Sequence, residues 1–152
     1  MKKILIAIAA LFAVAAPAAA QDFTGLRVEA TAGLDDLSKG LRSQDVNYGA
    51  AVGIDAPLGD RLTIGVEANV ANVFDREDFG VAGRLGLIAS DRVLLFGTAG
   101  YENFRNLDGL RVGGGAELSL TNTLYTKAEY RYSDFQHGVG RHQGLVGLGL
   151  RF

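Results

Sequence analysis

The residues of this chain whose side chains could take part in chemistry are mainly arginines and glutamates, placed at every second position. The set consists of Arg27, Glu29, Glu67, Arg84, Glu102, Arg111, Glu117, Lys127, Glu129, Arg131 and Arg151. Alternate side chains share one face of an extended strand, so all of them can gather on one side of a sheet. Buried there, opposite charges must pair to offset their desolvation. We therefore interpret the set as a paired charge network. A narrow ion path lined by arginine and glutamate is the alternative.

Residues for nucleophilic catalysis are few. The chain has no cysteine and two histidines, His137 and His142, and only Ser133 and Asp134 lie close enough in sequence to suggest a Ser-His-Asp arrangement. We interpret these residues as parts of a loop and of strand ends. The sequence therefore predicts no enzyme, no catalytic residue and no cofactor.

Two acidic clusters, residues 35–36 and 75–78, fall in segments that we expect to be loops. Their carboxylates could bind a divalent cation, directly or as a bridge to lipid phosphates. The spacing of an EF-hand is absent, and acidic loops are usually hydrated. We therefore predict no metal site.

The elements that position the charged residues are eight segments in which apolar and polar residues alternate with a period of two. Each has about ten residues, the length that a tilted strand needs to cross a bilayer. Short turns at residues 57–61, 89–92 and 121–123 alternate with longer polar segments at 35–45, 72–78, 103–109 and 134–141. The segments cover residues 26–34, 46–56, 62–70, 79–87, 93–102, 110–119, 124–133 and 144–152. This pattern predicts an all-β fold, an eight-stranded antiparallel up-and-down transmembrane β-barrel with both termini at the periplasmic end.

The apolar face of these segments carries no charged residue, which is typical of a wall that faces lipid. Small and aliphatic residues lie at the strand centres. Aromatic residues lie near the ends: Tyr48, Phe74, Phe79, Tyr101, Phe104, Tyr132 and Phe135 on the loop side, Phe23 and Phe152 on the turn side. We expect two aromatic belts at the membrane interfaces. Val66→Arg should then block insertion and Glu67→Gln should be mild. A soluble periplasmic barrel that binds an apolar ligand is the alternative.

Residues 1–20 have the three parts of a secretory signal peptide. Lys2 and Lys3 precede an apolar stretch, Pro17 ends it, and small residues favour cleavage between Ala20 and Gln21. Cleavage leaves residues 21–152 as one barrel domain with 13 basic and 17 acidic residues, a formal charge of −4. This charge argues against a nucleic-acid partner.

The C-terminal residues 144–152 alternate apolar residues and end in Phe152, and residues 124–132 read LYTKAEYRY. Both segments resemble the last two strands of opacity-type, porin-like small bacterial outer-membrane barrels, which are eight-stranded and OmpA/OmpX-like. The resemblance implies a location in the outer membrane of a Gram-negative bacterium and a structural or surface-interaction role. It also implies that the barrel-assembly machinery reads the last strand. Lipid, lipopolysaccharide and a surface ligand at the external loops are the partners we expect, and a narrow solute channel is the alternative function.

Overall fold

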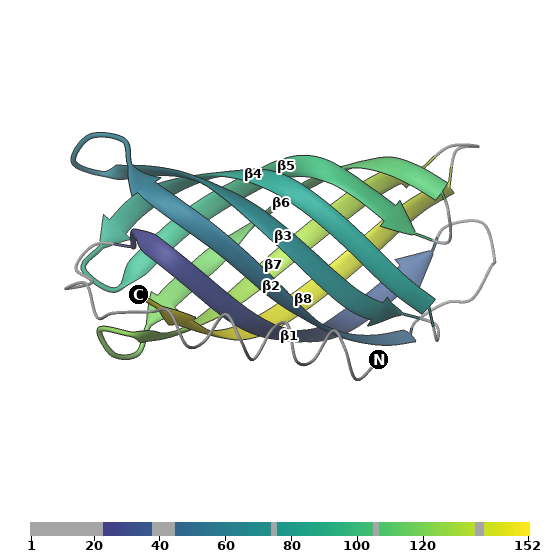
Figure 1. The fold of residues 1–152 in the computed structure, drawn as a ribbon, viewed down its shortest axis with the longest axis horizontal. Helices are drawn as coiled ribbons and strands as arrows, with labels where there is room; N and C mark the ends of the chain where they lie inside the picture. The colour runs from purple at the N-terminus through teal and green to yellow at the C-terminus, as the bar shows by residue number, and fades with distance from the viewer. Residues whose placement is uncertain (1–22, 38–44, 74–75, 105–106, 136–138) are drawn as a thin grey trace.

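The computed structural model describes residues 23–37, 45–73, 76–104, 107–135 and 139–152. These residues form one closed barrel of eight antiparallel strands (Figure 1). The strands are β1 (Gly25–Leu37), β2 (Asp45–Pro57), β3 (Leu62–Val73), β4 (Arg76–Ser90), β5 (Val93–Phe104), β6 (Leu107–Ser119), β7 (Leu124–Phe135) and β8 (Val139–Arg151). The predicted fold class is confirmed. The predicted signal peptide and its cleavage site lie outside the described residues.

Strand β8 pairs with β1 and closes the sheet. Backbone hydrogen bonds run from Leu26 N to Phe152 O at 3.0 Å and from Phe152 N to Leu26 O at 2.8 Å. A bilayer offers no water to an unpaired strand edge, so a sheet within it must close. The closure also brings both ends of the described chain to the end of the barrel that carries the short turns (Figure 1).

The strands are longer than predicted. They contain 12 to 15 residues, and the pairing continues into segments that we expected to be loops, as in Phe104↔Leu107 and Phe135↔Val139. The polar composition of these segments suggested loops because it lacks an apolar face. Antiparallel hydrogen bonding does not require an apolar face once the hairpin has left the hydrocarbon layer.

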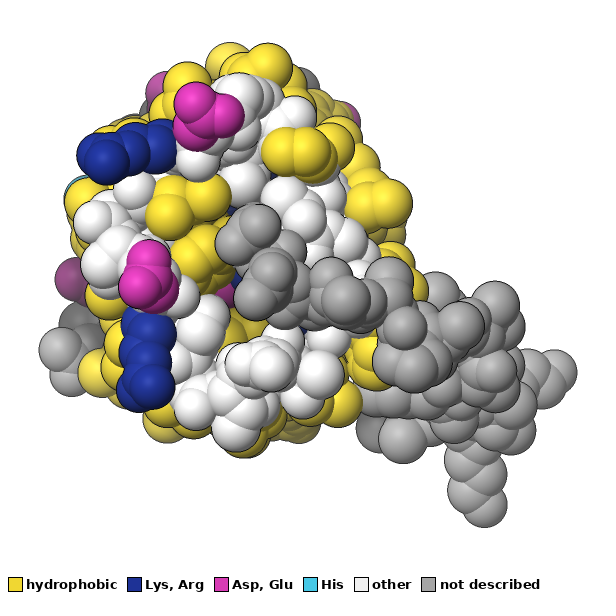
Figure 2. Space-filling view, turned by 90° about the vertical axis from the view of Figure 1, so that its left-hand side faces the viewer, with side chains coloured by type: hydrophobic (Ala, Val, Ile, Leu, Met, Phe, Trp, Pro, Cys, Tyr) yellow, Lys and Arg dark blue, Asp and Glu magenta, His cyan; other side chains and the backbone are white. Residues whose placement is uncertain are grey.

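The barrel wall is apolar outside and charged inside, the reverse of a soluble protein. Val66 on β3 and Leu148 on β8 are 60% and 53% exposed, whereas Arg27 and Glu117 are fully buried. On the outer surface the exposed charged residues of the short-turn end lie on the turns, around its rim (Figure 2). This distribution contradicts the alternative of a soluble barrel with an apolar interior.

The predicted aromatic belts are correct in part. Tyr48, Phe79, Tyr101 and Tyr132 are exposed on the outer wall. Phe23 and Phe135 are buried inside instead, so their assignment to the belts was wrong. Phe135 shares the inward parity of Arg131 and Ser133, and Phe23 turns inward through a left-handed backbone, with φ of 52°. Phe74 and the side chain of Phe104 lie outside the described part of the structure.

Candidate functional site: the charge network of the lumen

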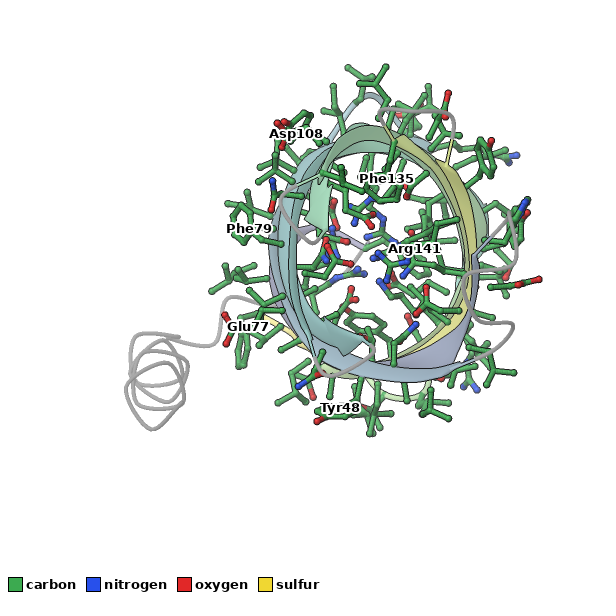
Figure 3. All side chains as sticks on the ribbon, turned by 90° about the vertical axis from the view of Figure 1, so that its right-hand side faces the viewer. Tyr48, Glu77, Phe79, Asp108, Phe135 and Arg141 are labelled. Carbon is green, nitrogen blue, oxygen red and sulfur yellow. The ribbon has the colours of Figure 1, made fainter. Side chains whose placement is uncertain are left out.

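The structure places all eleven charged residues selected from the sequence inside the barrel. Four more join them: Asp35, Asp55, Asp78 and Arg141. The buried charges among the described residues are therefore eight acidic and seven basic side chains. Figure 3, which looks from the hairpin end, shows Arg141 pointing into the lumen and Glu77, Phe79 and Asp108 pointing away from it. We call these fifteen residues the lumen network.

Near the short turns, the network is centred on Asp55 of β2. Its Oδ2 accepts hydrogen bonds from Arg27 Nε at 2.8 Å and from Arg84 Nη1 at 2.9 Å. Arg84 Nη2 donates to Glu117 Oε2 at 2.7 Å, and Arg151 Nη2 lies 2.7 Å from Glu117 Oε1. Strands β1, β2, β4, β6 and β8 are thereby joined across the lumen.

Aromatic rings cover the cations at this end. The Arg151 guanidinium lies 5.5 Å from the Phe23 ring centre and 4.9 Å from that of Tyr125, and Arg84 lies 4.2 Å from that of Phe96. Such contacts stabilise a desolvated cation. A mouth cavity of about 1010 Å³, lined by turn residues, reaches the lumen as far as Phe23, Tyr125 and Arg151.

In the middle of the barrel, Glu67 of β3 is a shared acceptor. Arg27 Nη1 donates to Glu67 Oε2 at 2.9 Å and to Glu29 Oε1 at 2.6 Å. Arg131 Nη2 donates to Glu67 Oε1 at 3.0 Å, and Arg131 Nε donates to Glu129 Oε1 at 2.7 Å. Glu67 therefore connects β1 with β7 across the lumen.

Lys127 completes this middle layer. Its Nζ forms an ion pair with Glu29 and lies 3.2 Å from Glu129 Oε2. The Tyr125 hydroxyl donates a hydrogen bond to Glu29 Oε1 at 2.7 Å. Glu29 is thus bound from three sides, because Arg27 also donates to it.

Toward the hairpin end, Arg141 of β8 binds three carboxylates. It donates to Asp35 at 2.6 Å and to Asp78 at 2.6 Å, and it pairs with Glu102. Ser133 donates a further hydrogen bond to Glu102 at 3.0 Å. Four different strands, β1, β4, β5 and β8, meet at this one guanidinium.

Arg111 of β6 bridges the middle and hairpin layers. Its Nη1 donates to Asn69 Oδ1 at 2.6 Å, Nη2 lies 3.9 Å from Glu67, and Nη1 lies 4.0 Å from Glu102. The lumen network is therefore continuous from Arg151 to Arg141. Paired side chains occupy the axis of the barrel along that length, as expected for an eight-stranded barrel.

Glycines on the inner face make room for the long side chains. A Cβ atom on Gly53 would lie 2.6 Å from Arg27 Nη2 and 2.8 Å from Val66 O. On Gly80 it would lie 2.8 Å from Arg111 Nη1. A methyl group fits at Gly53 only if an ion-paired guanidinium and the neighbouring backbone both move, and at Gly80 only if the side chains of Arg111 and Asn69 move.

We predict that Gly53→Ala lowers the free energy of unfolding by about 1–3 kcal/mol, the usual effect of overpacking. The matched control is Gly83→Ala on the outer face, where a Cβ would meet its nearest heavy atom at 3.8 Å. Urea titration of both variants in lipid vesicles would measure the difference. Equal stability of the two variants would contradict this account of the inner glycines.

The described acidic residues of the two predicted clusters lie on opposite faces of the barrel wall. Asp35 is buried in the lumen network, whereas its neighbour Asp36 is exposed outside. Glu77 and Asp78 divide in the same way, and Asp75 lies outside the described residues. The expectation of loop clusters was wrong because these residues continue strands. Within the described ranges, no group of three metal-ligating side chains could hold a metal ion.

The Ser-His-Asp arrangement is also not formed by the described residues. Ser133 points inward to Glu102, whereas the ring of His142 lies on the outer wall and is bonded to Tyr130. The sheet separates the two side chains. His137 lies outside the described residues.

Sequence reasoning missed Asp35, Asp78 and Arg141 because it ended the strands too early. Their parity was available as a signal: Asp35 follows the inward positions Glu29, Thr31 and Gly33 at the same spacing of two. Asp55 lies at a polar position of the predicted segment 46–56, but the selected charged residues do not include it. A period of two shows on which face of the sheet a side chain lies. The register between the strands then decides which side chains on that face contact each other.

The comparisons with known proteins agree with this architecture. A family model described as the outer membrane protein beta-barrel domain matches residues 6–152. No curated protein matches the chain. Within the described residues, no helix is long and apolar enough to span a membrane.

Three solved structures show the same fold at low sequence identity. Ail, the attachment invasion locus protein of Yersinia pestis, has a TM-score of 0.64 at 13% identity, covering 86% of this chain and 100% of Ail. Neisserial surface protein A has a TM-score of 0.59 at 15% identity, covering 85% and 98%. The N-terminal β-barrel domain of Pseudomonas aeruginosa OprF has a TM-score of 0.55 at 14% identity, covering 85% and 99%.

Proposed function

The chain belongs to the outer membrane protein beta-barrel domain family, and from that premise we propose that its lumen network closes the barrel and holds its wall together. The protein is an integral β-barrel of a Gram-negative outer membrane. In this proposal the lumen network has a structural role, and the outer surface of the protein interacts with other molecules. The network supplies the cross-barrel contacts that an apolar core supplies in a soluble domain.

The continuous series of ion pairs from Arg151 to Arg141 carries this proposal. A hydrated ion that crossed the lumen would have to separate pairs such as Arg27–Glu67 and Arg141–Asp78, which are buried. Breaking one buried pair costs about 3–5 kcal/mol when a charge is left without its partner. The near balance of eight acidic and seven basic groups also gives no selective field for one sign of ion.

Conductance in planar bilayers tests the closed barrel against the channel. We expect no stable open level for the unmodified protein. A stable open level that Glu117→Gln or Arg111→Gln abolishes would overturn the proposal, because it would show that these groups line a conducting path. Heat-modifiable migration on a denaturing gel would verify that each variant was folded before measurement.

We also propose that the short-turn end faces the periplasm and that the barrel-assembly machinery recognises β8. Both ends of the described chain lie at this end, and β8 forms the closing seam with β1. The side chains that β8 presents outward include the exposed Val146 and Leu148. Phe152 at its end is the residue that the resemblance to outer-membrane barrels marks as the assembly signal.

The opposite end would then face the outside of the cell. The structure of Ail has been solved in complex with a heparin analogue, sucrose octasulfate. For this chain we propose that the hairpin ends form a surface for an external ligand. Three hairpins at this end stay paired up to Val73↔Arg76, Phe104↔Leu107 and Phe135↔Val139, which supports such a platform.

A further inference from the structure

A polar cluster interrupts the apolar outer wall on β7 and β8. It consists of Tyr130, Tyr132 and His142, which we call the Tyr-His cluster. The Tyr130 hydroxyl is 2.6 Å from His142 Nδ1, and the Tyr132 and His142 ring centres are 4.9 Å apart. Tyr130 is 55% exposed and Tyr132 is 36% exposed. The three side chains therefore form one preorganised surface patch outside the barrel.

The patch lies at the height of the lipid headgroups on the hairpin side. A tilted strand rises about 2.5 Å per residue along the membrane normal, and the apolar band is about 25 Å tall, or about ten residues. On β1 the outward positions are apolar from Leu26 to Leu34, and Asp36 ends that band. Asp36 is the cross-strand neighbour of His142. The Tyr-His cluster thus lies at the boundary of the hydrocarbon layer.

The cluster retains hydrogen-bonding capacity toward the membrane. Among the described residues, His142 has one hydrogen-bond partner, the Tyr130 hydroxyl at Nδ1, which leaves Nε2 open. Gly144 lies directly opposite Tyr130, and a Cβ on it would meet no atom within 4 Å. The outer surface beside Tyr130 is therefore open at Gly144.

The chemistry around the patch favours a sugar. Flat aromatic faces pack against sugar rings, and an imidazole nitrogen and a carboxylate bond their hydroxyl groups. The exposed carboxylates Asp36 and Asp134 flank the cluster on β1 and β7, and they would repel a bare phosphate. On the side of the cluster nearer the short turns, Ala32, Ala128 and Val146 continue the apolar outer wall. Their side chains are small, so acyl chains can pack closely against the wall there.

We propose that the Tyr-His cluster binds a sugar ring of an outer-leaflet glycolipid headgroup. The ring would stack on Tyr130 and Tyr132, and its hydroxyls would bond His142 Nε2 and the Asp36 carboxylate. The acyl chains would lie on the wall formed by β7, β8 and β1. The proposal rests on the membrane orientation in the proposed function, but not on whether the barrel conducts.

Native mass spectrometry of the folded protein in detergent micelles, titrated with lipid A, tests the site. Lipid A is an acylated diglucosamine with a phosphate on each sugar, and in the proposed pose these phosphates lie away from Asp36 and Asp134. We expect Tyr130→Leu/Tyr132→Leu to weaken its binding by about tenfold, from the loss of two aromatic contacts. Phe79→Leu is the matched control, because Phe79 is 53% exposed on β4 away from the cluster, and it should change binding by less than about twofold.

Two outcomes would overturn the proposal. One is equal weakening by the control and the cluster variants. The other is equally tight binding of phosphatidylglycerol, which has acyl chains and a phosphate but no sugar. The imidazole supplies a second readout: the ¹⁵N signal of His142 Nε2, assigned with His142→Gln, should shift with lipid A and stay unchanged with phosphatidylglycerol. A conducting barrel that still passes these tests would refute only the closed-lumen proposal.

Discussion

Val66→Arg is expected to lower strongly the fraction of the barrel that inserts into membranes. Val66 lies at the middle of β3, is 60% exposed on the outer wall and pairs with Ile54 and Gly83 on its two sides. An arginine at this depth costs about 2–4 kcal/mol on the lipid face. That cost is a large part of the net stability of a small domain, which is about 5–15 kcal/mol.

Refolding into phospholipid vesicles measures this effect. The folded fraction is the part of the unheated sample that migrates faster than the boiled sample on a denaturing gel. Val66→Leu is the control, since it keeps the site apolar, and it should fold as the unmodified protein does. Normal insertion of Val66→Arg would show that Val66 does not meet hydrocarbon.

Which face a residue occupies could be predicted from the sequence because a strand has a period of two that sheet closure preserves. Once Glu29 and Val66 are assigned to opposite faces, every residue on their strands follows by parity. Lipid contact imposes this pattern strictly, since an inverted residue places a charge in hydrocarbon. The eight strands and the inward or outward direction of their side chains could therefore be predicted from the sequence.

The ends of the strands were harder to predict from the sequence, for a physical reason. Beyond the hydrocarbon layer both faces of a hairpin can be polar, so Asp35 and Asp36 look like one loop cluster although they lie on opposite sides of the wall. Phe135 was misassigned because residue type was weighted above parity. Its ring packs inside, within 2.6 Å of where a Cβ of Gly109 would lie.

The partners within the network could not be predicted from the pattern. Arg131 and Glu67 are 64 residues apart, and Tyr125 and Glu29 are 96 apart. Which of them meet across the lumen depends on the stagger of the strands around the closed barrel. Composition could indicate that charges pair, and only the register shows that Glu67 is shared among several cations.

This sharing changes the expected effect of Glu67→Gln. The sequence alone predicts a mild effect, because Glu67 faces the lumen and not the lipid. In the structure, Glu67 accepts from Arg27 and Arg131 and lies 3.9 Å from both Lys127 and Arg111. A neutral amide would remove one carboxylate partner from each of these four buried cations. We now expect Glu67→Gln to lower the free energy of unfolding by about 3 kcal/mol or more.

Urea titration in vesicles, followed by gel mobility, measures this loss in a chain that has no tryptophan. The matched control is Glu77→Gln, which removes the same charge from an exposed position on the outer face of β4 and should change little. In Glu67→Gln/Arg131→Met, a cation that loses one of its carboxylate partners is removed together with that carboxylate. The double variant should be more stable than the sum of the two single losses implies, because neighbours in one network are coupled. Strict additivity would mean that Glu67 and Arg131 act independently. The lumen network would then not stabilise the barrel as a coupled unit, and the hydrogen bonds between the strands would be the main stabilising interaction.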